Sequence, residues 1–140
     1  MSNTQAVSGI MKQVALAAVV DSKTLKAALY LASATTNGSN TAYTATGEVS
    51  GTNYSAGGVS VTNGNAAGLT STTAYWTPSA SITFTTVTLP TAFDAVMIYS
   101  TTDTNRNLGV FRFGSQTITA GTFTLTMPTN DSSTALIRFA

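Results

Sequence analysis

The chain of 140 residues contains no cysteine and no histidine, and only 8% of its residues are charged. Without cysteine it can form no disulfide framework, no thiolate nucleophile and no zinc–thiolate site. Without histidine it lacks the commonest general base and the commonest metal ligand. A formal net charge of +1 is far from the basic surface that nucleic-acid binding needs. These absences predict a protein that is not an enzyme and has no catalytic residues, metal, cofactor, small-molecule substrate or direct contact with nucleic acid.

Long apolar runs are also missing. The longest is Val14–Val20, seven residues, whereas a membrane-spanning helix needs about 20. A single positive charge, Lys12, precedes this run, which is too little for the usual start of a signal peptide. We therefore expect no membrane partner and no signal peptide.

The residues that are abundant are small, polar and uncharged. Threonine accounts for 28 residues, serine for 15, glycine for 11 and asparagine for 9. The hydrophobic fraction of 43% is too high for a disordered tail, whose low hydrophobicity usually accompanies high charge. The length predicts one domain over residues 1–140, divided into an N-terminal helical segment (1–22) and a β-sandwich (23–140).

The first twenty residues have helical periodicity. Apolar residues three or four positions apart form one face: Val7, Ile10, Met11, Val14 and Ala18. Either Ser2, in a capping box with Gln5, or Ser8 would begin the helix, and Asp21-Ser22 would end it. The apolar face either covers the sheet or docks on a partner. In the second case Ile10, Met11 and Val14 are candidate interface residues.

From Thr24 onward the apolar period changes to two, which is typical of strands. In Leu25–Leu31 the odd positions are apolar, so we expect one face of that strand to be buried. Asn63-Gly64 resembles a hairpin turn, and Pro78 and Pro90 are expected to interrupt strands. Further strands are expected at 59–62, 74–77, 82–89, 92–99, 108–113, 117–118, 122–127 and 135–139. About eight to ten short strands with frequent turns favour an all-β antiparallel sandwich or barrel.

Threonine suits strands because it is β-branched, and its hydroxyl keeps a surface polar without charge. In Phe123–Met127 apolar side chains alternate with threonines. Edge strands without lysine or glutamate favour pairing with another chain, and low net charge removes repulsion between copies. This composition therefore predicts a structural or interaction role, with self-association as a homodimer through an edge strand or the apolar helix.

Three groups of residues are candidates for chemical sites. Glu48 and Asp94 could form an acid–base pair, but they are better explained as solvated carboxylates at turns or strand ends. Asp103–Asn107 begins like a calcium-binding loop, yet the glycine and glutamate expected later in such a loop are absent. Tyr75 and Trp76 belong to the core, to a partner interface or to a sugar-stacking platform.

The order of several segments resembles a family of tailed-bacteriophage capsid cement, or decoration, proteins. The segments are Leu25-Lys26-Ala27-Ala28-Leu29-Tyr30, Thr41-Ala42-Tyr43-Thr44, Gly47–Gly58, Ala95–Tyr99, Asn105-Arg106, Phe113-Gly114, Thr119–Thr124 and Ala135–Ala140. The resemblance covers nearly the whole chain through many moderate matches, without one diagnostic motif. The N-terminal segment is less charged and less aromatic than is usual in that family, so interface residues are not carried over to it.

This resemblance implies a jelly-roll-like sandwich with one N-terminal helix. It also implies that the protein is made in the host bacterial cytoplasm and lies on the outer capsid surface of the virion. Its partners would be the major capsid protein, whose neighbouring subunits it would bridge, and further copies of itself. The alternative function is a fibre adhesin or carbohydrate-binding β-sandwich module. That alternative depends on Tyr75-Trp76 and on the turn-rich stretch 33–58, because loops on a rigid scaffold often carry recognition.

Overall fold

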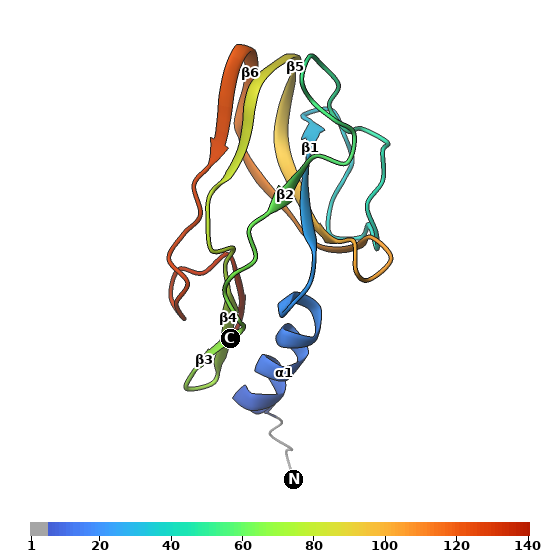
Figure 1. The fold of residues 1–140 in the computed structure, drawn as a ribbon. Helices are drawn as coiled ribbons and strands as arrows, with labels where there is room; N and C mark the ends of the chain where they lie inside the picture. The colour runs from blue at the N-terminus through green and yellow to red at the C-terminus, as the bar shows by residue number, and fades with distance from the viewer. Residues whose placement is uncertain (1–5) are drawn as a thin grey trace.

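The computed structural model describes residues 6–140, which form two antiparallel sheets and one helix (Figure 1). The elements of this described part are α1 (Gly9–Val20), β1 (Leu25–Leu31), β2 (Val59–Val61), β3 (Gly68–Thr70), β4 (Thr73–Trp76), β5 (Ile82–Ser100), β6 (Arg106–Leu125) and β7 (Ile137–Phe139). One sheet has the order β2-β1-β5-β6 and the other the order β3-β4-β7. The prediction of an all-β antiparallel sandwich with one N-terminal helix is confirmed.

The long hairpin of β5 and β6 forms much of the fold. The two strands pair antiparallel from Ile82↔Leu125 to Ser100↔Arg106, with several register shifts between Phe84 and Ala95. Thr86 and Ala120 have positive φ at these irregularities, with values of 53° and 47°. The hairpin bends sharply there, at the top of Figure 1, because bulges let a strand pass from one layer of a sandwich to the other.

This bend changes the predicted strand count. We expected a break at Pro90, with separate strands at 82–89 and 92–99, but both belong to β5. Likewise the three strands expected between residues 108 and 127 are the single strand β6. Pro90 is exposed at the bend, where it removes no buried hydrogen bond. The described residues therefore contain fewer and longer strands than the turn signals indicated.

The strand β1 begins and ends as predicted, but both of its faces are buried. Leu25, Ala27 and Leu29 pack in the main core, while Ala28 and Tyr30 pack in a second, smaller cluster with Met97 and Tyr99. The second face is buried because the connection between β1 and β2 folds over it: the hydroxyl of Tyr30 donates to the carbonyl of Thr44 (2.7 Å), and that of Tyr99 to the carbonyl of Gly57 (2.8 Å). The predicted face of Leu25, Ala27 and Leu29 is thus buried as expected, and the burial of the second face was not predicted.

Asn63-Gly64 does not form the predicted hairpin turn. β2 pairs with β1, and the chain after β2 crosses to the other sheet. The Asn63 amide donates to the carbonyls of Val20 (2.6 Å) and Lys23 (3.0 Å), so it stabilises the end of α1 instead of a turn. An Asn-Gly pair favours tight turns by its local conformation, but here the long-range hydrogen bonds of the side chain decide its role.

The start of α1 agrees with one of the two predicted starts, and its end agrees with the predicted end. The hydroxyl of Ser8 accepts a hydrogen bond from the backbone N–H of Met11 at 3.3 Å, as an N-cap does. The alternative start at Ser2 lies outside the described residues. The helix ends before Asp21, as expected, and the Asp21 carboxylate then accepts from the N–H of Ala67 at 2.8 Å. The cap and this contact fix both ends of α1 on the body of the protein.

Candidate interaction surface

The helix α1 packs on β3 and β4 through a face that contains its polar residues. The Gln13 amide donates to the carbonyl of Ala67 at 2.9 Å, and the Lys12 ammonium donates to the carbonyl of Thr72 at 3.3 Å. Leu16 and Val20 are fully buried on the same side. A side chain on Gly9 would meet the carbonyl of Ser71 at 2.7 Å, so glycine permits this close approach of helix and strand turn.

The opposite face of α1 is apolar and exposed. We name it the α1 stripe; it consists of Ile10, Met11, Val14 and Ala18 on the helix, together with Val7 just before it. Met11 is 63% exposed, Val14 61% and Ile10 59%. The expectation that this face covers the sheet was therefore wrong. Docking on a partner remains a prediction, and Ile10, Met11 and Val14 are placed where a partner could contact them.

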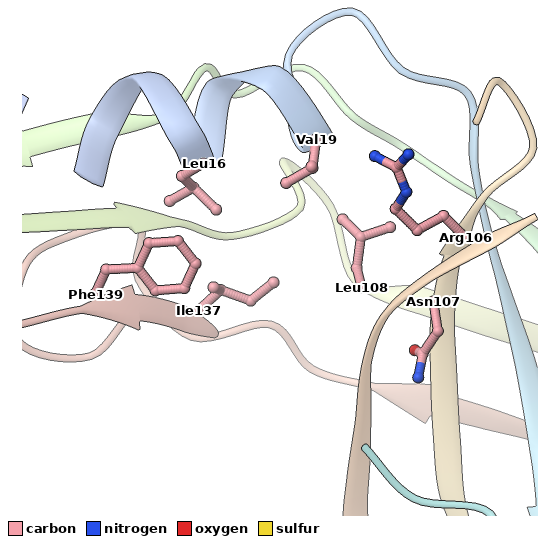
Figure 2. Close-up of a pocket in the computed structure, with 7 residues that line it drawn as sticks. All are labelled: Leu16, Val19, Arg106, Asn107, Leu108, Ile137 and Phe139. Carbon is pink, nitrogen blue, oxygen red and sulfur yellow. The ribbon is translucent and has the colours of Figure 1, made fainter. Parts of the chain in front are cut away.

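A pocket with a volume of about 130 Å³ lies beside the stripe, between α1, the start of β6, and β7. In Figure 2, Leu16 and Val19 project from α1 toward β7, while the Arg106 side chain reaches toward the end of the helix. The residues that line the pocket are Leu16, Val19, Arg106, Asn107, Leu108, Ile137 and Phe139. Five of these side chains are apolar, and Phe139 is 41% exposed at the opening.

Arg106 is the positive charge of this pocket. Its side chain is exposed, and it belongs to neither of the ion pairs found in the described part of the chain, Lys23–Asp103 (3.0 Å) and Arg112–Asp94 (2.6 Å). Asn107 is bound through its amide N–H to the carbonyl of Asn40, but its Oδ1 is buried without a partner within residues 6–140. The pocket thus combines an apolar lining with one cation, whereas the Asn107 carboxamide points away from it (Figure 2), toward Asn40.

Tyr75 and Trp76, the other predicted interface residues, lie elsewhere on β4. Trp76 has no exposed surface, and its indole N–H donates to Oδ1 of Asn63 (3.2 Å) and to the carbonyl of Asn65 (3.1 Å). The prediction of a partner contact at Trp76 therefore disagrees with the structure, because the ring belongs to the core. Tyr75 is half-buried and its ring lies over Gly68.

The exterior of the β5–β6 hairpin is coated with hydroxyl groups. Its exposed threonines are Thr83, Thr85, Thr86, Thr91, Thr117, Thr119, Thr122 and Thr124. Residues 49–93 include no charged side chain. β6 lies at the edge of its sheet and pairs with β5 on one side. An edge without lysine, glutamate or proline from Gly114 to Leu125 is suited to contact with another chain.

A second polar site, which the sequence analysis missed, surrounds the only glutamate of the chain. Glu48 accepts hydrogen bonds from the hydroxyls of Tyr43 (2.6 Å) and Tyr54 (2.7 Å) and from the N–H of Gly57 (2.8 Å). The Tyr54 hydroxyl also accepts from the N–H of Leu29, which connects the site to β1. The three bonds to Glu48 hold the connection 32–58 together internally, and the bond from Leu29 to Tyr54 ties it to the sheet. The sequence signal that could have indicated this site is a single glutamate between two tyrosines in a segment with no other charge.

Tyrosine ionisation is suppressed around Glu48. Burial, reinforced by the negative charge of Glu48, raises the pKa of Tyr30 to about 12. Burial first, and then the hydrogen bond to Glu48, raise the pKa values of Tyr43 and Tyr54. The pKa of Tyr99, whose ring stacks on Tyr43 at 4.8 Å, is raised for the same leading reason. The arrangement holds neutral tyrosines that act as hydrogen-bond donors.

Raising the pH above about 10 is expected to lower the free energy of unfolding. Tyrosines of the unfolded chain ionise near pH 10, whereas Tyr30 in the folded chain ionises near pH 12. In this window the unfolded state binds fewer protons than the folded state. The contribution of the neutral tyrosines to the free energy of unfolding is therefore fully present below pH 10 and decreases as the pH rises above it. Urea unfolding between about pH 9 and 11.5 measures the slope, and Tyr30→Phe should make it shallower. An unfolding free energy that does not change across this range would contradict the raised pKa values.

The remaining carboxylates have separate structural partners. Asp103, in the β5–β6 turn, binds Lys23, and that hydrogen bond lowers the pKa of its carboxyl group. Asp94 pairs with Arg112, and Asp131 accepts from the N–H groups of Ser133 and Thr134. Glu48 and Asp94 thus have different partners. Within residues 6–140 no three acidic side chains are grouped as metal ligands.

No helix in the described part of the chain is long and apolar enough to cross a membrane. Comparison with protein-family models, with curated proteins and with solved structures gives no match.

Proposed function

We propose that this chain is a structural protein of a tailed-bacteriophage particle that binds the outer surface of the capsid and cements neighbouring major capsid subunits. The observation that carries the proposal is the orientation of α1. The helix turns Lys12 and Gln13 toward its own sheet and presents the α1 stripe to solvent. A patch of large apolar side chains exposed in this way is typical of a surface that another protein covers.

The rigidity of α1 supports a docking role. The Ser8 cap, the close contact at Gly9, and the contacts of Gln13 and Asp21 with Ala67 hold the helix in one orientation. A prepositioned surface loses little conformational entropy when it binds, so more of the contact energy appears as affinity. This favours a lasting structural contact.

The uncharged threonine exterior supports contact with a large assembly or with further copies. Short hydroxyl side chains lose less rotamer entropy at an interface than lysine or glutamate side chains do. The outer edge of β6 from Gly114 to Leu125, beyond the bridge between Arg106 and Ala42, has no neighbouring strand in the described part of the chain and can supply backbone groups for the same purpose. We include a homodimer in the proposal for this reason. The sequence resemblance to capsid cement proteins is the reason for naming a phage capsid.

The alternative of a carbohydrate-binding module has lost its main support. A sugar-stacking platform needs an exposed aromatic face, and Trp76 has none. The connection 32–58, which would carry the recognition loops, is held to the sheet by hydrogen bonds from Leu29, Tyr30 and Tyr99. No observation in the described structure favours this alternative over the capsid role.

Co-sedimentation with expanded capsids tests the proposal. The capsids are assembled from the major capsid protein that the same genome encodes, without other surface proteins. We expect saturable binding at micromolar or lower concentration and a higher temperature of capsid rupture, because a ligand that binds the intact state stabilises it. Absence of binding at these concentrations, or a genome that encodes no capsid protein, would contradict the proposal.

A further inference from the structure

We infer that the pocket between α1, β6 and β7 anchors one large apolar side chain of a partner protein that stands next to a carboxylate. This inference rests on the proposed function, because it states the chemistry of the capsid segment that the chain would bind. It also makes a claim about the pocket alone, which can be measured without capsids.

The size of the pocket fits a single side chain. A dry cavity of about 150 Å³ lined by leucine, isoleucine and phenylalanine holds one benzene molecule. The pocket here measures about 130 Å³ and is lined mainly by the same residue types. Pockets for drug-sized ligands or cofactors are larger, at about 300–1,000 Å³. Apolar or aromatic anchors that fill such small pockets often supply much of the energy of a protein interface.

The charge of the pocket selects a carboxylate. The Arg106 guanidinium points toward the end of α1, near Val19, in Figure 2 and has no ion-pair partner in the described part of the chain. A guanidinium matches the planar geometry of a carboxylate and can bind it through two hydrogen bonds. A partner with an acidic group beside its apolar side chain would therefore be preferred over a neutral one.

The lining and the charge of the pocket together define its ligand. The apolar side chains of Leu16, Val19 and Leu108 match an apolar side chain of a partner, and the Arg106 guanidinium matches a nearby carboxylate. An amino-acid residue next to a carboxylate in a partner protein combines both groups.

The pocket continues into the α1 stripe. Val19 lines the pocket, and the exposed Ala15 lies one helical turn before it on the same side of α1. Ala15 is in turn four residues after Met11, which belongs to the stripe. One partner can therefore cover the stripe and place its anchor in the pocket.

A nuclear magnetic resonance titration with N-acetyl-leucine tests the inference directly. This probe carries an N–H, an isobutyl group and a carboxylate, and we expect it to shift the methyl signals of Leu16, Val19 and Leu108. N-acetyl-leucinamide, which lacks the charge, should bind about tenfold more weakly, as expected when one charge-assisted hydrogen bond is lost. Arg106→Gln should remove this difference between the probes. Arg138→Gln, which removes the same charge from an exposed position on β7, should preserve it.

The outcomes separate the pocket from the capsid role. Probe binding in the pocket without capsid binding would support the site and refute the proposed function. Capsid binding that Arg106→Gln and Arg138→Gln affect equally, with no probe shifts at the pocket, would refute the site alone. Shifts at the same methyl groups with decanoate but not with N-acetyl-leucine would overturn the inference in favour of a lipid.

Discussion

Replacing Trp76 with alanine is expected to lower the free energy of unfolding by about 3–5 kcal/mol, the usual cost of removing a buried tryptophan side chain. Trp76 is fully buried between the segments that join the two sheets. Its removal leaves a cavity and also leaves Oδ1 of Asn63 and the carbonyl of Asn65 without their indole donor. Asn63 in turn holds the end of α1, so the loss should extend to the helix. Urea unfolding followed by circular dichroism measures the change.

Two further variants separate the contributions at Trp76. Trp76→Phe retains most of the apolar volume but removes the N–H, so it should cost about 1–3 kcal/mol, the range for leaving a buried acceptor unpaired. Val14→Ala, on the exposed α1 stripe, is the control and should change stability by less than about 0.5 kcal/mol. If Trp76→Ala were as mild as Val14→Ala, the ring would not be a core residue.

Much of the sheet could be predicted from local patterns. The strand β1 matches its predicted bounds, and β2, β4 and β7 lie within or close to their predicted segments. These strands were identified because alternation of apolar residues and flanking turn residues are properties of a few neighbouring positions. The merging of strands around Pro90 was missed because a bend and a break have the same local signal.

The orientation of α1 could not be predicted. The periodicity of Ile10, Met11 and Val14 correctly shows that they share one face, but it does not say which face meets the sheet. That choice depends on the close contact between Gly9 and Ser71 and on the hydrogen bond from Gln13 to Ala67. Both contacts join segments more than fifty residues apart, so they belong to the tertiary structure.

Only the part of the candidate site that depends on local periodicity could be predicted. Ile10, Met11 and Val14 were identified and are exposed, whereas of the three alternatives for Trp76 the structure agrees with the core and not with an interface. That Arg106, Leu108 and Phe139 form a pocket was not predicted, because they come together from two separate strands. The Glu48 site was missed because its partners belong to a connection without regular structure.

Replacing Met11 and Val14 together with aspartate is expected to weaken binding to expanded capsids by at least about 100-fold. Two carboxylates buried at an apolar contact lose their hydration without gaining partners, which costs several kcal/mol, and about 2.7 kcal/mol already corresponds to 100-fold. Both side chains are more than 60% exposed in the free protein, so its core should not change. Aspartate at position 11 also lies in the first turn of α1, where the helix dipole favours a negative charge.

A matched control carries the same added charge away from α1. Ser39→Asp with Thr46→Asp changes two exposed residues of the connection between β1 and β2. It should bind capsids with nearly the affinity of the unchanged protein. Both double variants should unfold within about 0.5 kcal/mol of the unchanged protein, the usual range for surface substitutions. A folding defect would therefore be recognised before any loss of binding is interpreted.

The most direct test of the account is the capsid affinity of Met11→Asp/Val14→Asp measured beside that of Ser39→Asp/Thr46→Asp in one sedimentation series. If α1 faces the capsid shell, the first pair of substitutions abolishes binding at concentrations where the second pair still saturates the particles. Equal affinities for the two folded variants would show that the apolar side of α1 is not what attaches this protein to an assembly.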